Sequence, residues 1–151
     1  MCNDDIKTMQ YMWVYYLYVQ IKVTMTGLKE DVDYEQKKMV ELLTDIKQLM
    51  DVLSPESTPD KILLQKEKIS TIAVKSKETL LFKSLREKDN ELTMFESYSF
   101  RESDPLERLD LIFRHMIERV QNVSKKGAPY VMGCFMLGFV WMDNHIKESG
   151  L

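Results

Sequence analysis

The sequence predicts an all-α protein, a single-domain bundle of about five helices around an apolar helix near the carboxy terminus. Glycine is scarce, with five residues among 151, which is few for a turn-rich β fold or a phosphate-binding loop. Apolar residues recur at helical spacing in several segments, and prolines fall where helices would begin or end. No linker or internal repeat separates these segments, so residues 1–151 are interpreted as one domain.

The first clear amphipathic helix spans residues 33–53. Its apolar residues fall on one side, within about 120° of arc at 100° per residue, and acids and lysines are expected elsewhere. The segment "SPESTP" ends it, because its two prolines disfavour helical geometry in the residues before them. The apolar side consists of Met39, Leu42, Leu43, Ile46, Leu49, Met50 and Leu53.

A second helix is predicted from Pro59 to about residue 89, with Thr58 as its cap and Asp60 at the positive end of its dipole. Its apolar residues form two lines about 100° apart, so we expect it to pack against two neighbours. An interruption near Thr79 remains open. The lines consist of Ile62, Ile69, Ala73 and Leu80, and of Leu63, Val74, Leu81 and Leu85.

The next helix is predicted between residues 104 and 127. Asp104 is suited to cap it, Pro105 to its first turn and Glu107 to a capping box, while Gly127 suits its end. One face is apolar and packs on the core in this interpretation. That face contains Leu106, Leu109, Ile112, Phe113, Met116, Ile117, Val120 and Val123.

The run "YVMGCFMLGFVWM", residues 130–142, predicts a helix that is apolar on all sides, starting near Pro129. Such a helix is either a membrane span or the centre of a folded domain. A span needs about twenty apolar residues, whereas this run has thirteen. The core is therefore the favoured place for it, an interface comes next, and no membrane span is predicted.

The amino-terminal segment "YMWVYYLYVQIKVTMTG" supports two interpretations. From Val19 to Thr26 apolar and polar residues alternate, which is typical of a strand. A helical pattern also fits the front half, and the remaining chain offers only residues 93–100 as a weak pairing partner. A fifth helix is therefore favoured, with an α+β domain as the alternative. Tyr and Trp residues exposed here would be anchors for a partner; they are Tyr11, Trp13, Tyr15, Tyr16 and Tyr18.

No pattern in the chain predicts catalysis, a metal site or a cofactor, so the protein is interpreted as a non-enzyme. His115 is expected on the exposed face of its helix, and His145 at a helix end where a positive charge is favourable. Cys134 lies in the apolar run, where burial suppresses thiol reactivity. Ser54 and Thr58 each precede a proline and are candidate phosphorylation sites, although a helix stop and a helix cap explain the same residues.

The net charge of −3 gives no overall case for nucleic acid, but residues 57–89 carry eight basic and five acidic side chains. On one helix, a stripe of basic residues would extend about 37 Å at 1.5 Å per residue and would suit an anion or nucleic acid. A solvated face explains the same pattern. The stripe consists of Lys61, Lys68, Lys75, Lys83 and Arg86.

The leading hypothesis is an intracellular helical module, cytoplasmic or nuclear, that binds another protein or itself through exposed aromatic and apolar surface. A more specific version is a groove that takes up an amphipathic helix. An apolar helix wrapped by amphipathic ones resembles in outline the apoptosis-regulator type of bundle, although none of that family's short motifs is present. The alternative is an anion- or nucleic-acid-binding domain that uses the basic stripe.

Overall fold

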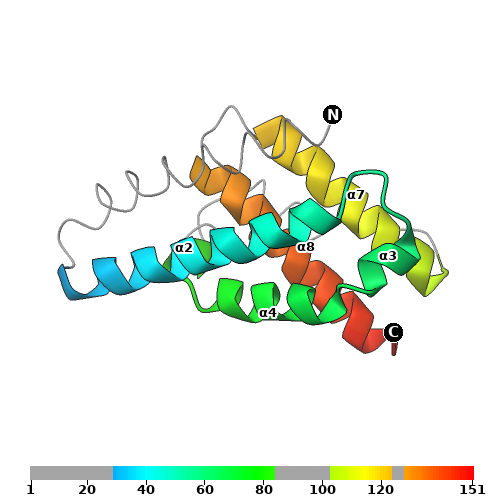
Figure 1. Ribbon diagram of the computed structural model, residues 1–151, viewed down its shortest axis with the longest axis horizontal. Coiled ribbons are helices and arrows are strands. Elements are labelled where there is room, and N and C mark those ends of the chain that lie inside the picture. The colour runs from blue at the N-terminus through cyan, green and yellow to red at the C-terminus, as the bar shows by residue number, and fades with distance from the viewer. Residues whose placement is uncertain (1–28, 84–102, 124–127) are drawn as a thin grey trace.

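The computed structural model describes residues 29–83, 103–123 and 128–151 (Figure 1). Across these ranges there are helices and turns but no strand, so the all-α prediction is confirmed. Residues 80–83 form a further helical turn. The region predicted as either a helix or a strand, residues 15–26, lies outside the described residues. The helices are α2 (Lys29–Val52), α3 (Pro59–Leu63), α4 (Lys66–Lys77), α7 (Pro105–Val123) and α8 (Ala128–Glu148).

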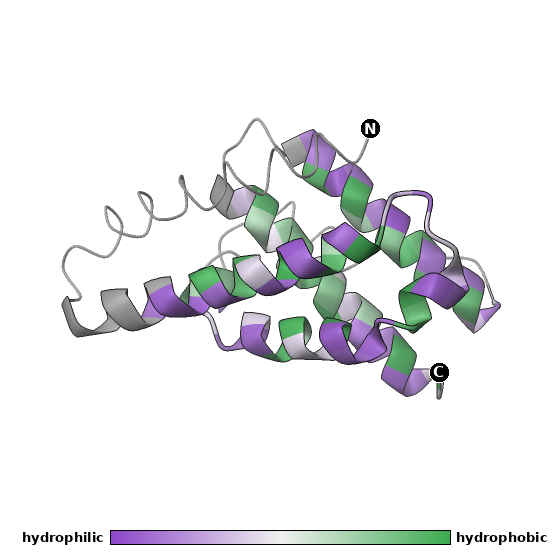
Figure 2. Ribbon diagram, in the orientation of Figure 1, coloured by the Kyte–Doolittle hydropathy of each residue, from purple (hydrophilic) through white to green (hydrophobic). Residues whose placement is uncertain are grey.

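Helix α8 occupies the centre of the bundle. It packs against α4 and against α7 (Figure 1), and all residues from 131 to 140 are buried. The hydropathy colouring shows how its apolar turns lie behind α2 and α4 (Figure 2). Burial of a large apolar side chain contributes about 1.5–3 kcal/mol, so this helix supplies much of the driving force for folding. The prediction of an apolar core helix is confirmed.

No helix among the described residues is long and apolar enough to cross a membrane. Helix α8 fails this criterion because its apolar run ends at Asp143, Asn144 and His145. Asp143 is nevertheless buried, and its Oδ2 accepts a hydrogen bond of 2.9 Å from Lys147 Nζ one turn later. Helix α8 therefore continues beyond its apolar run, and the buried Asp143 carboxylate there is paired with Lys147.

Helices α7 and α8 approach closely at Gly138. A Cβ placed on Gly138 would lie 2.8 Å from the Cβ of Met116, and closer still to Met116 Cγ and Sδ. Glycine is thus required here for space, because Met116 is fully buried and has little room to retreat. The whole apolar face predicted for α7 between Leu109 and Val120 is buried.

Helix α2 packs on α4. All seven residues of its predicted apolar side are buried, as expected from their spacing. Glu35 is the exception to the predicted pattern, because this acid lies on the same side of the helix and is only 3% exposed. The expectation that acids occur only elsewhere on α2 is therefore wrong at this position.

The prediction of one helix over residues 59–89 is wrong, because the chain turns at two places. Thr58 does cap α3, as expected, but α3 ends at Leu63 and α4 begins at Lys66. Between them Gln65 has φ −98° and ψ 15°, outside helical geometry, which redirects the chain. A second interruption follows at Thr79, near which the sequence also permits a break.

The two predicted apolar lines are altered by these breaks. Val74 and Leu80 are 48% and 43% exposed, whereas Ile72 and Phe82, which were on neither line, are buried. Each break rotates the following residues about the helix axis, so a projection drawn on one continuous helix no longer gives the buried side.

Helix α8 ends in a glycine motif. Gly150 has φ +69°, and its N–H donates to Lys147 O at 3.4 Å, while Leu151 N donates to Ile146 O at 3.1 Å. These two bonds satisfy carbonyls that a helix terminus otherwise leaves unpaired. Leu151 packs against the core, and its carbonyl accepts a 3.2 Å hydrogen bond from Lys66 Nζ. The motif thus ties the end of α8 to the start of α4.

Candidate functional site

The aromatic residues predicted to bind a partner are outside the described residues. Their contribution to binding stays a prediction. They are Tyr11, Trp13, Tyr15, Tyr16 and Tyr18.

The basic residues of the predicted stripe do not share one helix. Lys61 lies on α3, Lys68 and Lys75 on α4, and Lys83 beyond the break at Thr79, while Arg86 is not among the described residues. Lys75 Nζ donates to Asp45 Oδ2 at 2.7 Å. This hydrogen bond raises the pKa of the Lys75 ammonium, with a further contribution from the charge of Glu41. An anion at Lys75 would have to compete with Asp45, and anion binding by the stripe stays a prediction.

An open groove of about 340 Å³ runs between α2 and α4. It is lined by three lysines and two glutamates: Lys37, Lys38, Glu41, Lys75 and Glu78. All five of these side chains end in a charged group. Grooves that take up the apolar face of an amphipathic helix are lined by hydrophobic side chains, which these five residues do not supply.

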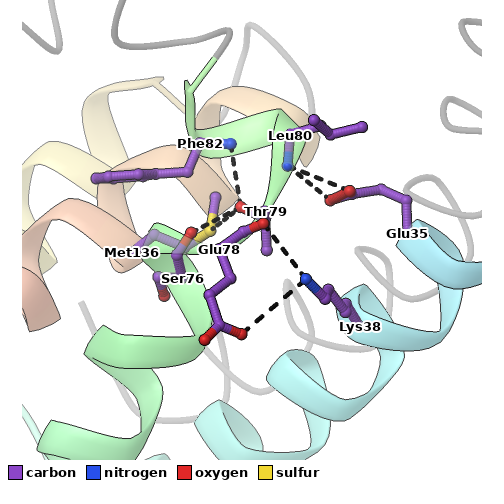
Figure 3. A network of polar contacts seen from close by, with 8 residues as sticks. All are labelled: Glu35, Lys38, Ser76, Glu78, Thr79, Leu80, Phe82 and Met136. Atoms are coloured by element: carbon purple, nitrogen blue, oxygen red, sulfur yellow. Dashed lines mark hydrogen bonds and ion pairs between the residues drawn. The ribbon is translucent and has the colours of Figure 1, made fainter. Parts of the chain in front are cut away.

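A polar network that is buried at Glu35 and Thr79 and exposed at Glu78 holds the end of α4 against α2 and α8 (Figure 3). Both carboxylate oxygens of Glu35 accept from the backbone N–H of Leu80, at 3.0 and 3.1 Å. Lys38, one turn further along α2, donates to the carbonyl of Glu78 at 3.4 Å and lies 4.0 Å from the Glu78 carboxylate. Glu35 thus binds the start of the helical turn at residues 80–83, and Lys38 binds the end of α4. Helix dipoles favour a negative charge at a helix start and a positive charge at a helix end.

Thr79 lies between those two contacts and caps the new turn itself. Its Oγ1 accepts from Phe82 N at 3.1 Å and lies 2.8 Å from the carbonyl of Ser76 and 3.7 Å from Met136 Sδ. A hydroxyl has one proton, and a carbonyl is a better acceptor than a thioether, so the proton is assigned to Ser76 O. The hydroxyl is fully buried and satisfied, which makes it structural rather than reactive.

The two histidines are both at least half-buried. His145 lies in the last turn of α8, as predicted, and it is buried there, with its Nε2 2.8 Å from the carbonyl of Pro105. Because a carbonyl only accepts, Nε2 carries a proton and donates. Ser149 Oγ lies 3.4 Å from Nδ1. His145 therefore fastens the end of α8 to the start of α7.

His115 is half-buried rather than exposed. Burial lowers its pKa from the ordinary value of 6.5, and Arg119 lowers it further, while Glu118 raises it. Cys134 is buried, as predicted. Among the described residues, no group of three or more His, Cys, Asp or Glu side chains is arranged to hold a metal ion.

Arg114 on α7 holds the loop between α2 and α3. Its Nε donates to Asp110 Oδ2 at 2.9 Å, so the guanidinium is oriented by its own helix. Its remaining nitrogens donate to the carbonyl of Pro55 and, at 3.5 Å, to that of Ser57. Within the loop, Ser57 is buried and its Oγ accepts from Ser54 N at 2.8 Å. The loop is therefore fixed from inside and from α7.

This fixed loop leads into a surface that we name the α3 edge. Leu64, directly after α3, is 81% exposed, more than any other large apolar residue in the described chain, whereas Ile62 two residues earlier is fully buried. Helix α3 packs on α7, so the leucine projects from an anchored turn. The α3 edge consists of the exposed residues Glu56, Thr58, Asp60, Lys61 and Leu64.

The sequence carries partial signals for two of the residues that periodicity alone does not identify. Leu64 lies on neither apolar line of the predicted helix, which leaves it without a buried place. Glu35 precedes Met39 by one turn and so falls on the apolar side of α2. No spacing rule connects Arg114 with the carbonyls of Pro55 and Ser57, because backbone acceptors carry no sequence signature.

The comparisons with known proteins give no relative: no family model, curated protein or solved structure matches the chain.

Proposed function

We propose that the protein is a non-enzymatic helical module that binds another protein or a second copy of itself. The observation that carries this proposal is the exposure of Leu64, at 81%, on a turn anchored by a fully buried neighbour. Ordering a loop on binding costs free energy. Because Arg114 already fixes the loop before α3, a partner at the α3 edge would avoid much of that cost.

The α3 edge has the composition of a small recognition surface. One apolar side chain lies among charged ones, with Asp60 and Lys61 on α3 and Glu56 in the loop, all exposed. Interfaces commonly combine an apolar anchor with a polar rim. The aromatic residues Tyr11, Trp13, Tyr15, Tyr16 and Tyr18 remain part of the proposal as a second binding surface, on the strength of their side-chain type.

Affinity capture followed by quantitative mass spectrometry tests the proposal. The baits are the wild type, Leu64→Asp, the double variant Trp13→Ala/Tyr15→Ala, and Val74→Asp as a matched control. Val74 is also an exposed apolar residue, at 48%, but lies on α4 away from the α3 edge. Thermal melting followed by circular dichroism confirms that each bait is folded.

We expect proteins retained by both the wild type and Val74→Asp to be lost from Leu64→Asp or from the aromatic variant. Self-association is measured in parallel by light scattering of the purified wild type. A strictly monomeric protein whose four baits capture identical sets of proteins would contradict the proposal.

A further inference from the structure

Two residues of the loop between α2 and α3, Ser54 and Thr58, precede prolines, and the structure distinguishes them. Ser54 is half-buried, and its backbone N–H is bonded to Ser57 Oγ at 2.8 Å inside the turn. Thr58 is exposed, with an extended backbone at φ −72° and ψ 156°. Its Oγ1 accepts only a long hydrogen bond, 3.4 Å from Lys61 N. Of the two residues, Thr58 is the more exposed to solvent.

The residues after Thr58 add a second distinction. Proline-directed protein kinases recognise the proline that follows the acceptor, and one branch of them also prefers a basic residue three positions after it. The sequence Thr58-Pro59-Asp60-Lys61 meets both conditions, and Lys61 is exposed. The sequence Ser54-Pro55-Glu56-Ser57 meets the first condition alone, and Ser57 is buried.

We propose that Thr58 is a phosphorylation site for a proline-directed kinase of the branch that reads a basic residue three positions on. The γ-phosphorus of ATP is transferred to Thr58 Oγ1: the bond to the bridging oxygen of ADP breaks, the Oγ1–P bond forms, and the hydroxyl proton is released. Ser54 is not an acceptor in the folded protein.

The modification adds about 1.5–2 negative charges to the α3 edge. The guanidinium of Arg114, which already donates to the carbonyls of Pro55 and Ser57, is a cation held at the same loop. A phosphate at Thr58 therefore changes the charge of this surface while the loop keeps its attachment to α7. This assignment rests on the exposure and the extended backbone of Thr58. It is independent of whether the protein binds a partner at the α3 edge.

The test incubates the folded, unmodified protein with a purified kinase of that branch and ATP labelled at the γ-phosphate, and maps the label by mass spectrometry. The variants are Thr58→Ala, Thr58→Ser, Ser54→Ala and Lys61→Glu, with a synthetic peptide of residues 52–64 as the unfolded reference. Thr58→Ser keeps both the helix cap and a hydroxyl, so it separates loss of the acceptor from loss of the cap.

We expect equal labelling of the wild type and Ser54→Ala, retained labelling of Thr58→Ser, and none in Thr58→Ala. Lys61→Glu should be labelled at least about tenfold more slowly, the effect of losing one charge-assisted contact to the kinase. Label on Ser54 of the folded protein, label on the peptide alone, or no label on either would overturn the proposal.

Discussion

Glu35 and Lys38, one turn apart on α2, bind opposite sides of a single chain break. The carboxylate accepts from Leu80 N, and the ammonium donates to the carbonyl of Glu78 (Figure 3). Only Thr79 separates those two backbone groups, and its own hydroxyl caps the turn that follows. The position of α2 thus fixes the direction of the chain after α4, which carries Phe82 into the core.

Replacing Glu35 by Ala should destabilise the protein by about 1–3 kcal/mol, because it removes the acceptor for Leu80 N at a part-buried site. Amide hydrogen exchange at Leu80 should accelerate more than exchange in α7. Glu35→Gln keeps one side-chain oxygen and should show a smaller effect. The control is Glu41→Ala, an exposed acid on the same helix. Equal exchange rates at Leu80 in Glu35→Ala and the wild type would refute the capping role.

Gly138→Ala should destabilise the protein by about 1–3 kcal/mol, the usual cost of overpacking, because the added methyl overlaps Met116. Urea unfolding measures this change. The matched experiment repeats Gly138→Ala in a Met116→Ala background, where the overlapping atoms are absent and the additional cost should vanish. If the substitution costs the same in both backgrounds, the close approach of α7 and α8 is not its cause.

Arg114→Ala should loosen the loop before α3 while changing global stability little. Surface ion pairs contribute about 0–1 kcal/mol, and the Arg114 side chain is 45% exposed. The measurement is the rate of cleavage after Glu56 by a glutamate-specific protease, which should rise in Arg114→Ala. Arg114→Lys keeps the charge without the guanidinium fork and should be intermediate. An unchanged cleavage rate would show that Arg114 does not hold the loop.

Stability should fall on acidification through the titration of His115. Its folded pKa lies below the ordinary value of 6.5, mainly because of burial, so the unfolded chain takes up the proton first. The stability present above pH 6.5 is therefore lost as the pH falls from 6.5 towards the lower folded pKa. Urea unfolding over this interval should show a smaller pH dependence for His115→Gln than for the wild type. A steeper pH dependence of stability in His115→Gln than in the wild type would contradict the loss of stability assigned to protonation of His115.

Regular periodicity made much of this fold predictable from sequence. The apolar sides of α2 and α7 follow a period that needs no knowledge of the partner helices, and α8 is buried because it lacks a polar side. The prediction of one long helix from Pro59 was wrong because a helical projection assumes that the helix is unbroken. The break at Thr79 is held by tertiary contacts from Glu35 and Lys38 to the residues on either side of it, which local sequence does not encode.

The candidate site was less predictable for the same reason. The absence of Leu64 from both predicted apolar lines was a signal of its exposure, but the attachment of the loop follows from Arg114, which is more than fifty residues away in sequence. By contrast, Thr58 was identified correctly as a cap from local sequence, because capping involves only its own neighbours.

The fold described above requires that α8 be enclosed by the other helices of the chain, and the thiol of Cys134 reports on that enclosure. In a Cys2→Ser variant, Cys134 is the single cysteine of the chain. Its reaction with a thiol reagent is followed in native buffer and in denaturant. We predict that native labelling proceeds at the rate of opening of the bundle and becomes immediate on unfolding. Native labelling as fast as that of the unfolded chain would contradict an enclosed α8.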